Sequence, residues 1–253
     1  MVFGWCDSCV PSLDPRFAMA VLVTVIAGLV RGFSGFGSAL LFIPLAGALY
    51  DSKTAILILW TIDALGTLPV LPPHLRSARW PEVVPLAVGG VATLPVGVWV
   101  LTHGDPIWLR WAVSVMVLAS TLALASGWRY HRAASRGMTL AVGGLAGFTN
   151  GAVGIGGPPV VLFWLSGQAN AAQARSNIFA FFAVTTLTSL AAYLWQGIFT
   201  LPLFVMGLIL TPFYGVAVYA GGRIFQRTGD RGFRQAAFWL CAIAAILGIP
   251  IGH

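Results

Sequence analysis

Long apolar runs alternate with short polar breaks from Phe17 to Ile251. A helix that crosses a bilayer needs about 20 mostly apolar residues, and these runs lack the polar face that a helix in water would carry. The pattern therefore predicts an all-α polytopic membrane protein. We expect ten apolar segments, over residues 17–35, 37–49, 55–71, 82–102, 107–127, 138–155, 157–168, 176–195, 200–220 and 233–251.

Composition agrees with this environment. Hydrophobic residues make up 58% of the 253 residues and charged residues only 8%, whereas soluble domains carry about 25% charged residues. Water is therefore excluded as the solvent for most of the surface. We expect a multi-pass protein of the cell inner (cytoplasmic) membrane.

The basic residues are concentrated in three of the polar breaks. These breaks hold Arg76 and Arg79, then Arg129, Arg132 and Arg136, and finally Arg223, Arg227, Arg231 and Arg234. Basic residues gather in cytoplasmic loops, so the net charge of +7 indicates topology and not nucleic-acid binding. We expect the breaks 72–81, 127–137 and 221–232 to be cytoplasmic and both chain ends to face the other side.

The two halves of the chain resemble each other. Gly35-Phe36-Gly37 aligns with Gly154-Ile155-Gly156, and the same shift aligns residues 51–55 with 170–174. Five segments per half, an odd number, give the halves opposite orientations, which is the inverted-repeat architecture of many secondary transporters. The predicted division is a short N-terminal segment (1–16), a first membrane repeat (17–127), a basic cytoplasmic loop (128–137) and a second membrane repeat (138–253).

Each predicted repeat contains a Gly-rich broken helix. The richer glycine cluster extends from Gly143 to Pro159. Glycine costs a helix about 1 kcal/mol per position and proline about 3, but proline is tolerated in a first turn. We expect a helix that ends near Gly154, a turn over 154–157, and a new helix from Pro158 or Pro159. Whether the short segments beside these breaks are crossings or re-entrant hairpins stays open.

Such a break favours an anion, because it presents a positive helix end and unpaired backbone N–H groups at membrane depth. Residues 31–38 form a weaker copy, in which Ser34 and Ser38 add hydroxyl donors. Close helix packing is the alternative explanation. Small residues at such contacts are four positions apart, as in Gly28/Gly32, Gly143/Gly147 and Gly147/Gly151.

Two ionisable residues are predicted inside the membrane, where such groups are rare and usually functional. Arg31 would attract the anion, and Asp63 would carry a coupling proton; a purely structural Arg31–Asp63 pair is the alternative. Arg175 lies beside a segment start, where a cytoplasmic anchor is the alternative to substrate binding. Asn177 and Gln173 can donate neutral hydrogen bonds to oxyanion oxygens.

The run Gly147-Phe148-Thr149-Asn150-Gly151 through Gly154-Ile155-Gly156-Gly157-Pro158-Pro159, with Arg175-Ser176-Asn177 following, resembles the TauE/SafE family of membrane transporters. The duplicated glycine motif and the segment order extend this resemblance over nearly the whole chain. The resemblance implies export of sulfite or of organosulfonates such as sulfoacetate. The first copy departs from the usual pattern, with Gly-Phe-Gly-Ser where a further glycine is common.

These observations predict a secondary transporter for a small anion and no enzyme, with no catalytic residue, metal or cofactor. Its partners are the anionic substrate and the lipid bilayer, with a homodimer left open. The predicted substrate-binding residues are Arg31, Ser34, Gly35, Gly37, Ser38, Asn150, Gly151, Gly154, Gly156, Gly157, Pro158, Arg175 and Asn177, and Asp63 is the coupling candidate.

Two alternatives remain at this stage. The first is a transporter of another small anion, such as a carboxylate. The second is a membrane-embedded thiol oxidoreductase that uses Cys6 and Cys9, although Cys241 alone does not supply the relay that it needs.

Overall fold

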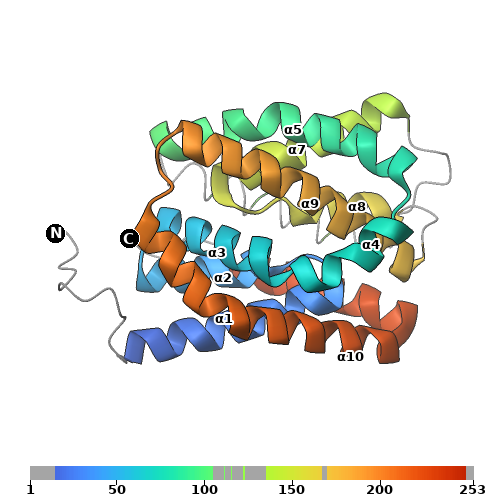
Figure 1. Cartoon of the computed structure of the whole chain (residues 1–253). Helices are drawn as coiled ribbons and strands as arrows, with labels where there is room; N and C mark the ends of the chain where they lie inside the picture. Colours follow the sequence, from blue (N-terminus) through green and yellow to red (C-terminus); the bar gives the residue numbers. More distant parts are fainter. Residues whose placement is uncertain are drawn as a thin grey trace.

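The computed structural model describes residues 15–104, 111, 115, 122, 135–166 and 170–248, and within these its regular elements are all helices (Figure 1). They are α1 (Pro15–Ser34), α2 (Ser38–Leu49), α3 (Ser52–Gly66), the 3-10 helix η1 (Leu68–Val70), α4 (Leu71–Ser77), α5 (Trp80–His103), α7 (Arg136–Val153), α8 (Gly157–Ser166), α9 (Ala171–Trp195) and α10 (Leu201–Gly248). The predicted segment 107–127 lies almost entirely outside the described residues.

Five helical stretches in the described part of the chain are long and apolar enough to cross a membrane. They cover Arg16–Ser34, Ser52–Ser77, Trp80–His103, Ala171–Trp195 and Leu201–Thr228. Large apolar side chains such as Leu22, Val216 and Trp195 are exposed on them, as expected for a surface that faces lipid. The prediction of an all-α polytopic membrane protein is thus confirmed.

The predicted break at 72–81 is much shorter than expected. Pro72 lies in the first turn of α4, where its missing N–H costs no hydrogen bond, so the chain stays helical to Ser77. Only Ala78 and Arg79 separate α4 from α5.

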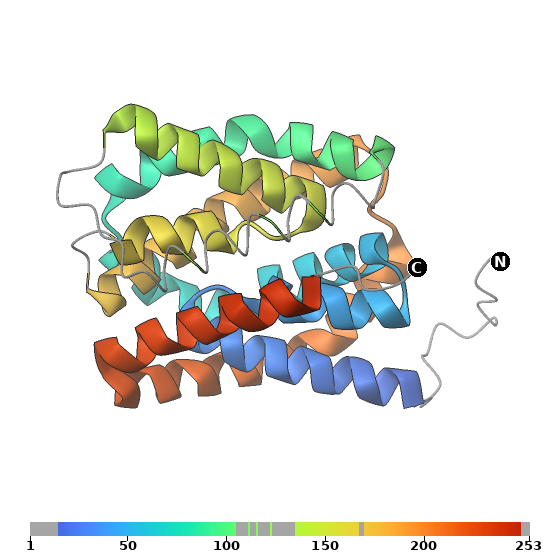
Figure 2. The ribbon, with the colours of Figure 1, turned by 180° about the vertical axis from the view of Figure 1, so that it is seen from behind.

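The predicted break at 221–232 is wrong, because α10 is helical from Leu201 to Gly248. Its Gly221 is a packing residue: a Cβ there would lie 2.2 Å from the carbonyl oxygen of Leu29 in α1. In Figure 2 the red end of α10 lies beside the orange part of the same element. The sequence pattern therefore predicted that the chain reverses direction near these residues, but it did not predict that they are helical.

Glycines allow two pairs of helices to pack with their backbones nearly touching. A Cβ on Gly32 of α1 would lie 1.9 Å from the Val218 carbonyl oxygen of α10. A Cβ on Gly147 of α7 would lie 2.1 Å from the Gly90 carbonyl oxygen of α5. The packing explanation for the four-residue glycine spacing therefore holds for these positions.

These two pairs form the outer layers of the molecule. Figure 1 shows α1 and α10 along one side and α5 and α7 along the other, with α2, α3, α8 and α9 between them. The inner helices are strongly buried; Ile58 and Ile62 of α3 and Ile178 and Phe181 of α9 are fully inaccessible. The two glycine turns, after α1 and after α7, both lead into this middle layer.

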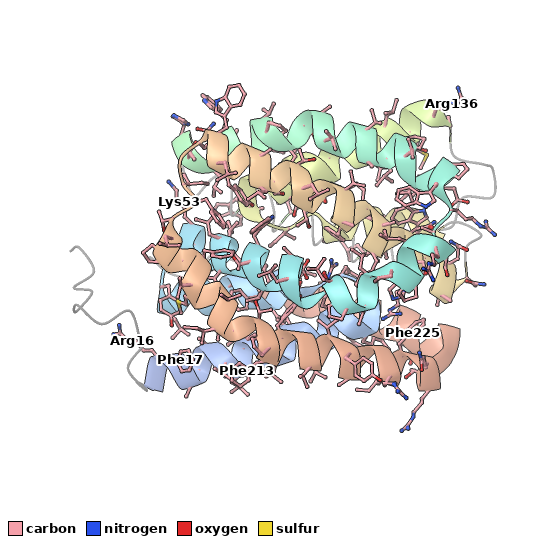
Figure 3. All side chains as sticks on the ribbon, in the orientation of Figure 1. Arg16, Phe17, Lys53, Arg136, Phe213 and Phe225 are labelled. Atoms are coloured by element: carbon pink, nitrogen blue, oxygen red, sulfur yellow. The ribbon has the colours of Figure 1, made fainter. Side chains whose placement is uncertain are left out.

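The two ends of the helix bundle differ in which residues they carry. Figure 3 shows Arg136 and Phe225 at one end and Arg16 and Lys53 at the opposite end. We refer to the former as the Arg136 end.

Candidate functional site

Each glycine turn consists of three residues between two helices, 35–37 between α1 and α2 and 154–156 between α7 and α8. Between α1 and α2, Gly35 and Gly37 have φ angles of 78° and 89°; between α7 and α8, Gly154 has φ 73°. These left-handed conformations suit glycine, which has no Cβ to clash. Ser34 stabilises the first turn, since its Oγ donates to the Phe36 carbonyl oxygen at 2.6 Å.

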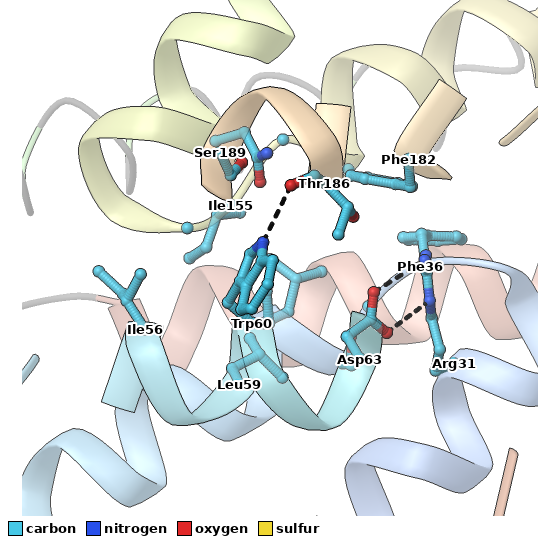
Figure 4. Close-up of a pocket in the computed structure, with 18 of the residues that line it drawn as sticks. Arg31, Phe36, Ile56, Leu59, Trp60, Asp63, Ile155, Phe182, Thr186 and Ser189 are labelled. Carbon is cyan, nitrogen blue, oxygen red and sulfur yellow. Dashed lines mark hydrogen bonds and ion pairs between the residues drawn. The ribbon is translucent and has the colours of Figure 1, made fainter. Parts of the chain in front are cut away.

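A cavity of about 70 Å³ lies between the two turns (Figure 4). The residues that line it come from both halves of the sequence and belong to α1, the first turn, α2, α3, α7, the second turn, α8 and α9. They are Arg31, Phe36, Gly37, Ser38, Ala39, Leu40, Ile56, Leu59, Trp60, Asp63, Asn150, Gly154, Ile155, Gly156, Gly157, Phe182, Thr186, Ser189 and Tyr193.

Two helix N-termini face this cavity. Helix α2 begins at Ser38 with Gly37 as its N-cap, and no side chain caps it. Helix α8 begins at Gly157, which also lines the cavity. The first backbone N–H groups of a helix have no partner within the helix; among the first three residues of α8 only Gly157 has such a group, because Pro158 and Pro159 have no N–H. Each helix N-terminus carries the equivalent of roughly half a positive charge. The arrangement therefore creates a positive potential in the cavity.

A buried ion pair forms one wall of the cavity. Arg31 Nη2 donates to Asp63 Oδ2 at 3.0 Å, and Arg31 Nε lies 2.9 Å from Oδ1 (Figure 4). Tyr214 from α10 donates its hydroxyl to Asp63 Oδ1 at 2.5 Å. The predicted pairing of Arg31 with Asp63 is thus present in the structure, and the two charges largely cancel.

Arg31 is also held by its surroundings. Its Nη1 donates to the carbonyl of Gly35, which connects the guanidinium to the first glycine turn. The guanidinium lies 5.0 Å from the ring centre of Phe179 and 4.8 Å from that of Phe182. These aromatic faces stabilise a cation that is removed from water.

Helix α9 supplies a polar strip that the sequence did not single out. Thr186, Ser189 and Tyr193 line the cavity from this helix, and the Trp60 indole donates to the Thr186 carbonyl oxygen at 3.1 Å. Hydroxyl residues in an apolar segment commonly bond their own helix backbone, as Ser189 does with Thr185. The sequence signal for these residues is the spacing of 182, 186, 189 and 193, which places them on one face of a helix.

The structure brings together eight of the predicted site residues. Those that line the cavity are Arg31, Gly37, Ser38, Asp63, Asn150, Gly154, Gly156 and Gly157. Ser34 ends α1 and Gly35 lies in the first glycine turn, and neither lines the cavity. Pro158 lies in the first turn of α8, and Gly151 packs against Leu94 of α5.

Arg175 and Asn177 lie elsewhere. Arg175 Nη2 donates to the Gly32 carbonyl oxygen at 2.5 Å. Asn177 joins α9 to the start of α5, because its Oδ1 accepts from the Arg79 backbone N–H at 2.9 Å and its Nδ2 donates to Glu82 at 3.1 Å.

Among the described residues there is no group of three or more His, Cys, Asp or Glu side chains that could hold a metal ion. Cys6 and Cys9 lie outside the described residues.

No curated protein and no solved structure matches the chain. The family model described as "Sulfite exporter TauE/SafE" matches residues 20–248, which is nearly the whole sequence and includes both glycine turns. The chain therefore belongs to the sulfite exporter TauE/SafE family of membrane transporters.

Proposed function

We propose that the protein is a secondary transporter that moves a small anion across the cytoplasmic membrane, and that sulfite or an organosulfonate is its substrate. The observation that carries this proposal is the meeting of two helix N-termini, from α2 and α8, at one cavity. Helix N-termini bind anions through their unpaired N–H groups and dipoles. Family membership supports transport in place of thiol chemistry.

The charge balance of the cavity supports a small anion. Arg31 and Asp63 cancel each other when both are ionised. The two helix N-termini then leave a surplus of about one positive charge, which a monovalent anion neutralises. If Asp63 takes up a proton, Arg31 is released to attract the anion directly, and the site accommodates one more negative charge.

The cavity volume supports the small end of the substrate class. Its volume is about 70 Å³, whereas pockets for drug-sized ligands have roughly 300–1,000 Å³. An anion of the size of sulfite fits such a space, and a longer sulfonate requires a wider conformation. Hydroxyl groups that line the cavity, such as that of Thr186, add neutral hydrogen-bond donors for oxyanion oxygens.

An inverted repeat is the architecture that we propose for this transporter. Gly35 lies against Arg175, and Gly154 lies against Ile56; adding 119 to 35 gives 154, and subtracting 119 from 175 gives 56. Each contact is thus the counterpart of the other. The pairing of α1 with α10 and of α7 with α5 is reciprocal in the same way. Such repeats permit alternating access around a central site.

The proposed orientation has the Arg136 end in the cytoplasm, in agreement with the positive-inside rule. Lys53 and the start of α1 are then on the outside (Figure 3). The bilayer is the environment of the five apolar helical stretches.

Reconstituted flux tests the proposal. The purified chain in proteoliposomes is assayed with sulfite, a sulfonate series, sulfate and small carboxylates. We expect saturable flux of sulfite or a sulfonate that excess unlabelled substrate inhibits. Preference for a carboxylate would replace the substrate assignment, and absence of flux for every anion would contradict the transporter proposal.

A further inference from the structure

A second buried cation, Arg175, lies near the cavity without lining it. Arg175 is only 7% exposed. Its Nη2 donates to the Gly32 carbonyl oxygen at 2.5 Å, while its buried Nε has no hydrogen-bond partner. The guanidinium lies between two aromatic rings, 5.2 Å from the centre of Phe179 and 4.8 Å from that of Phe225.

The charge of Arg175 lacks a carboxylate partner among the described residues. The ion pairs in that part of the chain are Arg31–Asp63 and Arg79–Glu82, and neither includes it. Arg175 also lies close to the N-terminus of α9, whose first turn has no acidic residue. The helix dipole there repels a cation. A carbonyl and two aromatic faces compensate such a charge only in part.

The position of Arg175 connects the cavity with the Arg136 end. Arg31 and Arg175 share the Phe179 ring, with the Arg31 guanidinium 5.0 Å from its centre. A Cβ on Gly35 would lie 3.2 Å from Arg175 Cγ, so Arg175 packs directly behind the first glycine turn. On its other side it contacts Phe225, which Figure 3 places at the Arg136 end.

We infer that Arg175 is a second anion-binding station, distinct from the cavity, which an oxyanion occupies on its way between the cavity and the Arg136 end. The inference rests on the proposed transport function. The Gly32 carbonyl oxygen now accepts the hydrogen bond that an oxyanion oxygen would accept in its place. The second nitrogen of the fork, Nε, is unpaired, so the guanidinium can bind two oxygens of one anion.

The test is the sidedness of substrate affinity in oriented proteoliposomes. In Arg175→Gln, we expect the sulfite concentration for half-maximal flux to rise about tenfold from the Arg136 end, the effect of one lost charge-assisted hydrogen bond. From the opposite side it should change less than about twofold, because the cavity is intact. Arg223→Gln is the matched control: Arg223 is exposed and stacks on Tyr219, so its loss should have little effect on either side.

Arg175→Lys distinguishes the effect of the charge from the effect of packing, and it replaces Arg175→Gln in the measurement if that variant does not fold. Lysine keeps the charge but not the fork, so a smaller rise that is still confined to the Arg136 end is expected. Equal changes on both sides, or a lower maximal rate with unchanged half-saturation, would mean that Arg175 only holds α9 to α1, and the inference would fall. Absence of anion flux in the unmodified protein would instead overturn the proposed function.

Discussion

The hydroxyl of Tyr214 in α10 donates a 2.5 Å hydrogen bond to Oδ1 of Asp63 in α3. Arg31 in α1 binds the same carboxylate, so one side chain connects three helices. Arg31 in turn donates to the Gly35 carbonyl in the first glycine turn. A change in the charge of Asp63 is therefore transmitted through Arg31 to the turn that precedes α2, beside the proposed anion site.

The stability of the buried ion pair gives the first prediction. Arg31→Gln or Asp63→Asn alone leaves one charge buried without its partner, and such changes cost about 3–5 kcal/mol. The double variant removes both charges and should recover most of that loss. Thermal unfolding of the purified protein in detergent measures the effect. Additive losses in the double variant would mean that the two residues do not stabilise each other.

The second prediction concerns the cavity wall at Gly157. A Cβ there would lie 3.2 Å from a Phe36 ring carbon and not against backbone atoms. Gly157→Leu should therefore fold, fill space in the cavity, and lower sulfite flux at least about tenfold, since it covers the Gly157 N–H at the start of α8. Flux and unfolding temperature are measured together on the same preparation.

Two further glycines make that experiment specific. Gly137→Leu is the control, because a Cβ at Gly137 meets nothing within 4 Å. Gly156→Leu should lose stability as well as flux, since its Cβ would lie 2.8 Å from the Ala146 carbonyl oxygen. Normal flux in folded Gly157→Leu would mean that the glycine cluster from Gly143 to Pro159 serves only in helix packing.

The sequence predicted those features that depend on neighbouring residues. Helix α7 ends at Val153 and α8 begins at Gly157, close to the boundaries expected from the glycines and prolines between Gly154 and Pro159, and the apolar segments follow from composition. The contacts of Tyr214 and Thr186 with residues far away in the sequence were not predicted. Tyr214 lies 151 positions from its partner Asp63, and Thr186 contacts Trp60 across 126 positions; neither has a local signal. Arg175 was assigned to the central site, but its long side chain reaches Gly32 instead.

Membrane topology gives the third prediction. Ser135 precedes α7 at its N-terminus, and Gln196 follows α9 at its C-terminus. With the native cysteines replaced by serine, Ser135→Cys and Gln196→Cys should react with membrane-impermeant thiol reagents from opposite sides, Ser135→Cys from the cytoplasm. Labelling of both positions from the periplasmic side would contradict the inverted five-plus-five arrangement.

The last prediction separates a structural Asp63 from a proton-coupling one. If Asp63 carries a proton during transport, Asp63→Asn should abolish uphill flux driven by a pH gradient, because asparagine cannot exchange a proton. Substrate exchange at equal pH should survive, since the helix N-termini of α2 and α8 remain in place. Arg31→Gln should mainly weaken anion affinity, because it removes positive charge beside the cavity. If the pair is only structural, the double variant Arg31→Gln with Asp63→Asn should regain pH-driven transport along with its stability. The decisive measurement is therefore pH-driven flux against exchange in the same vesicles, and undiminished pH-driven flux in Asp63→Asn would rule out a proton role for this carboxylate.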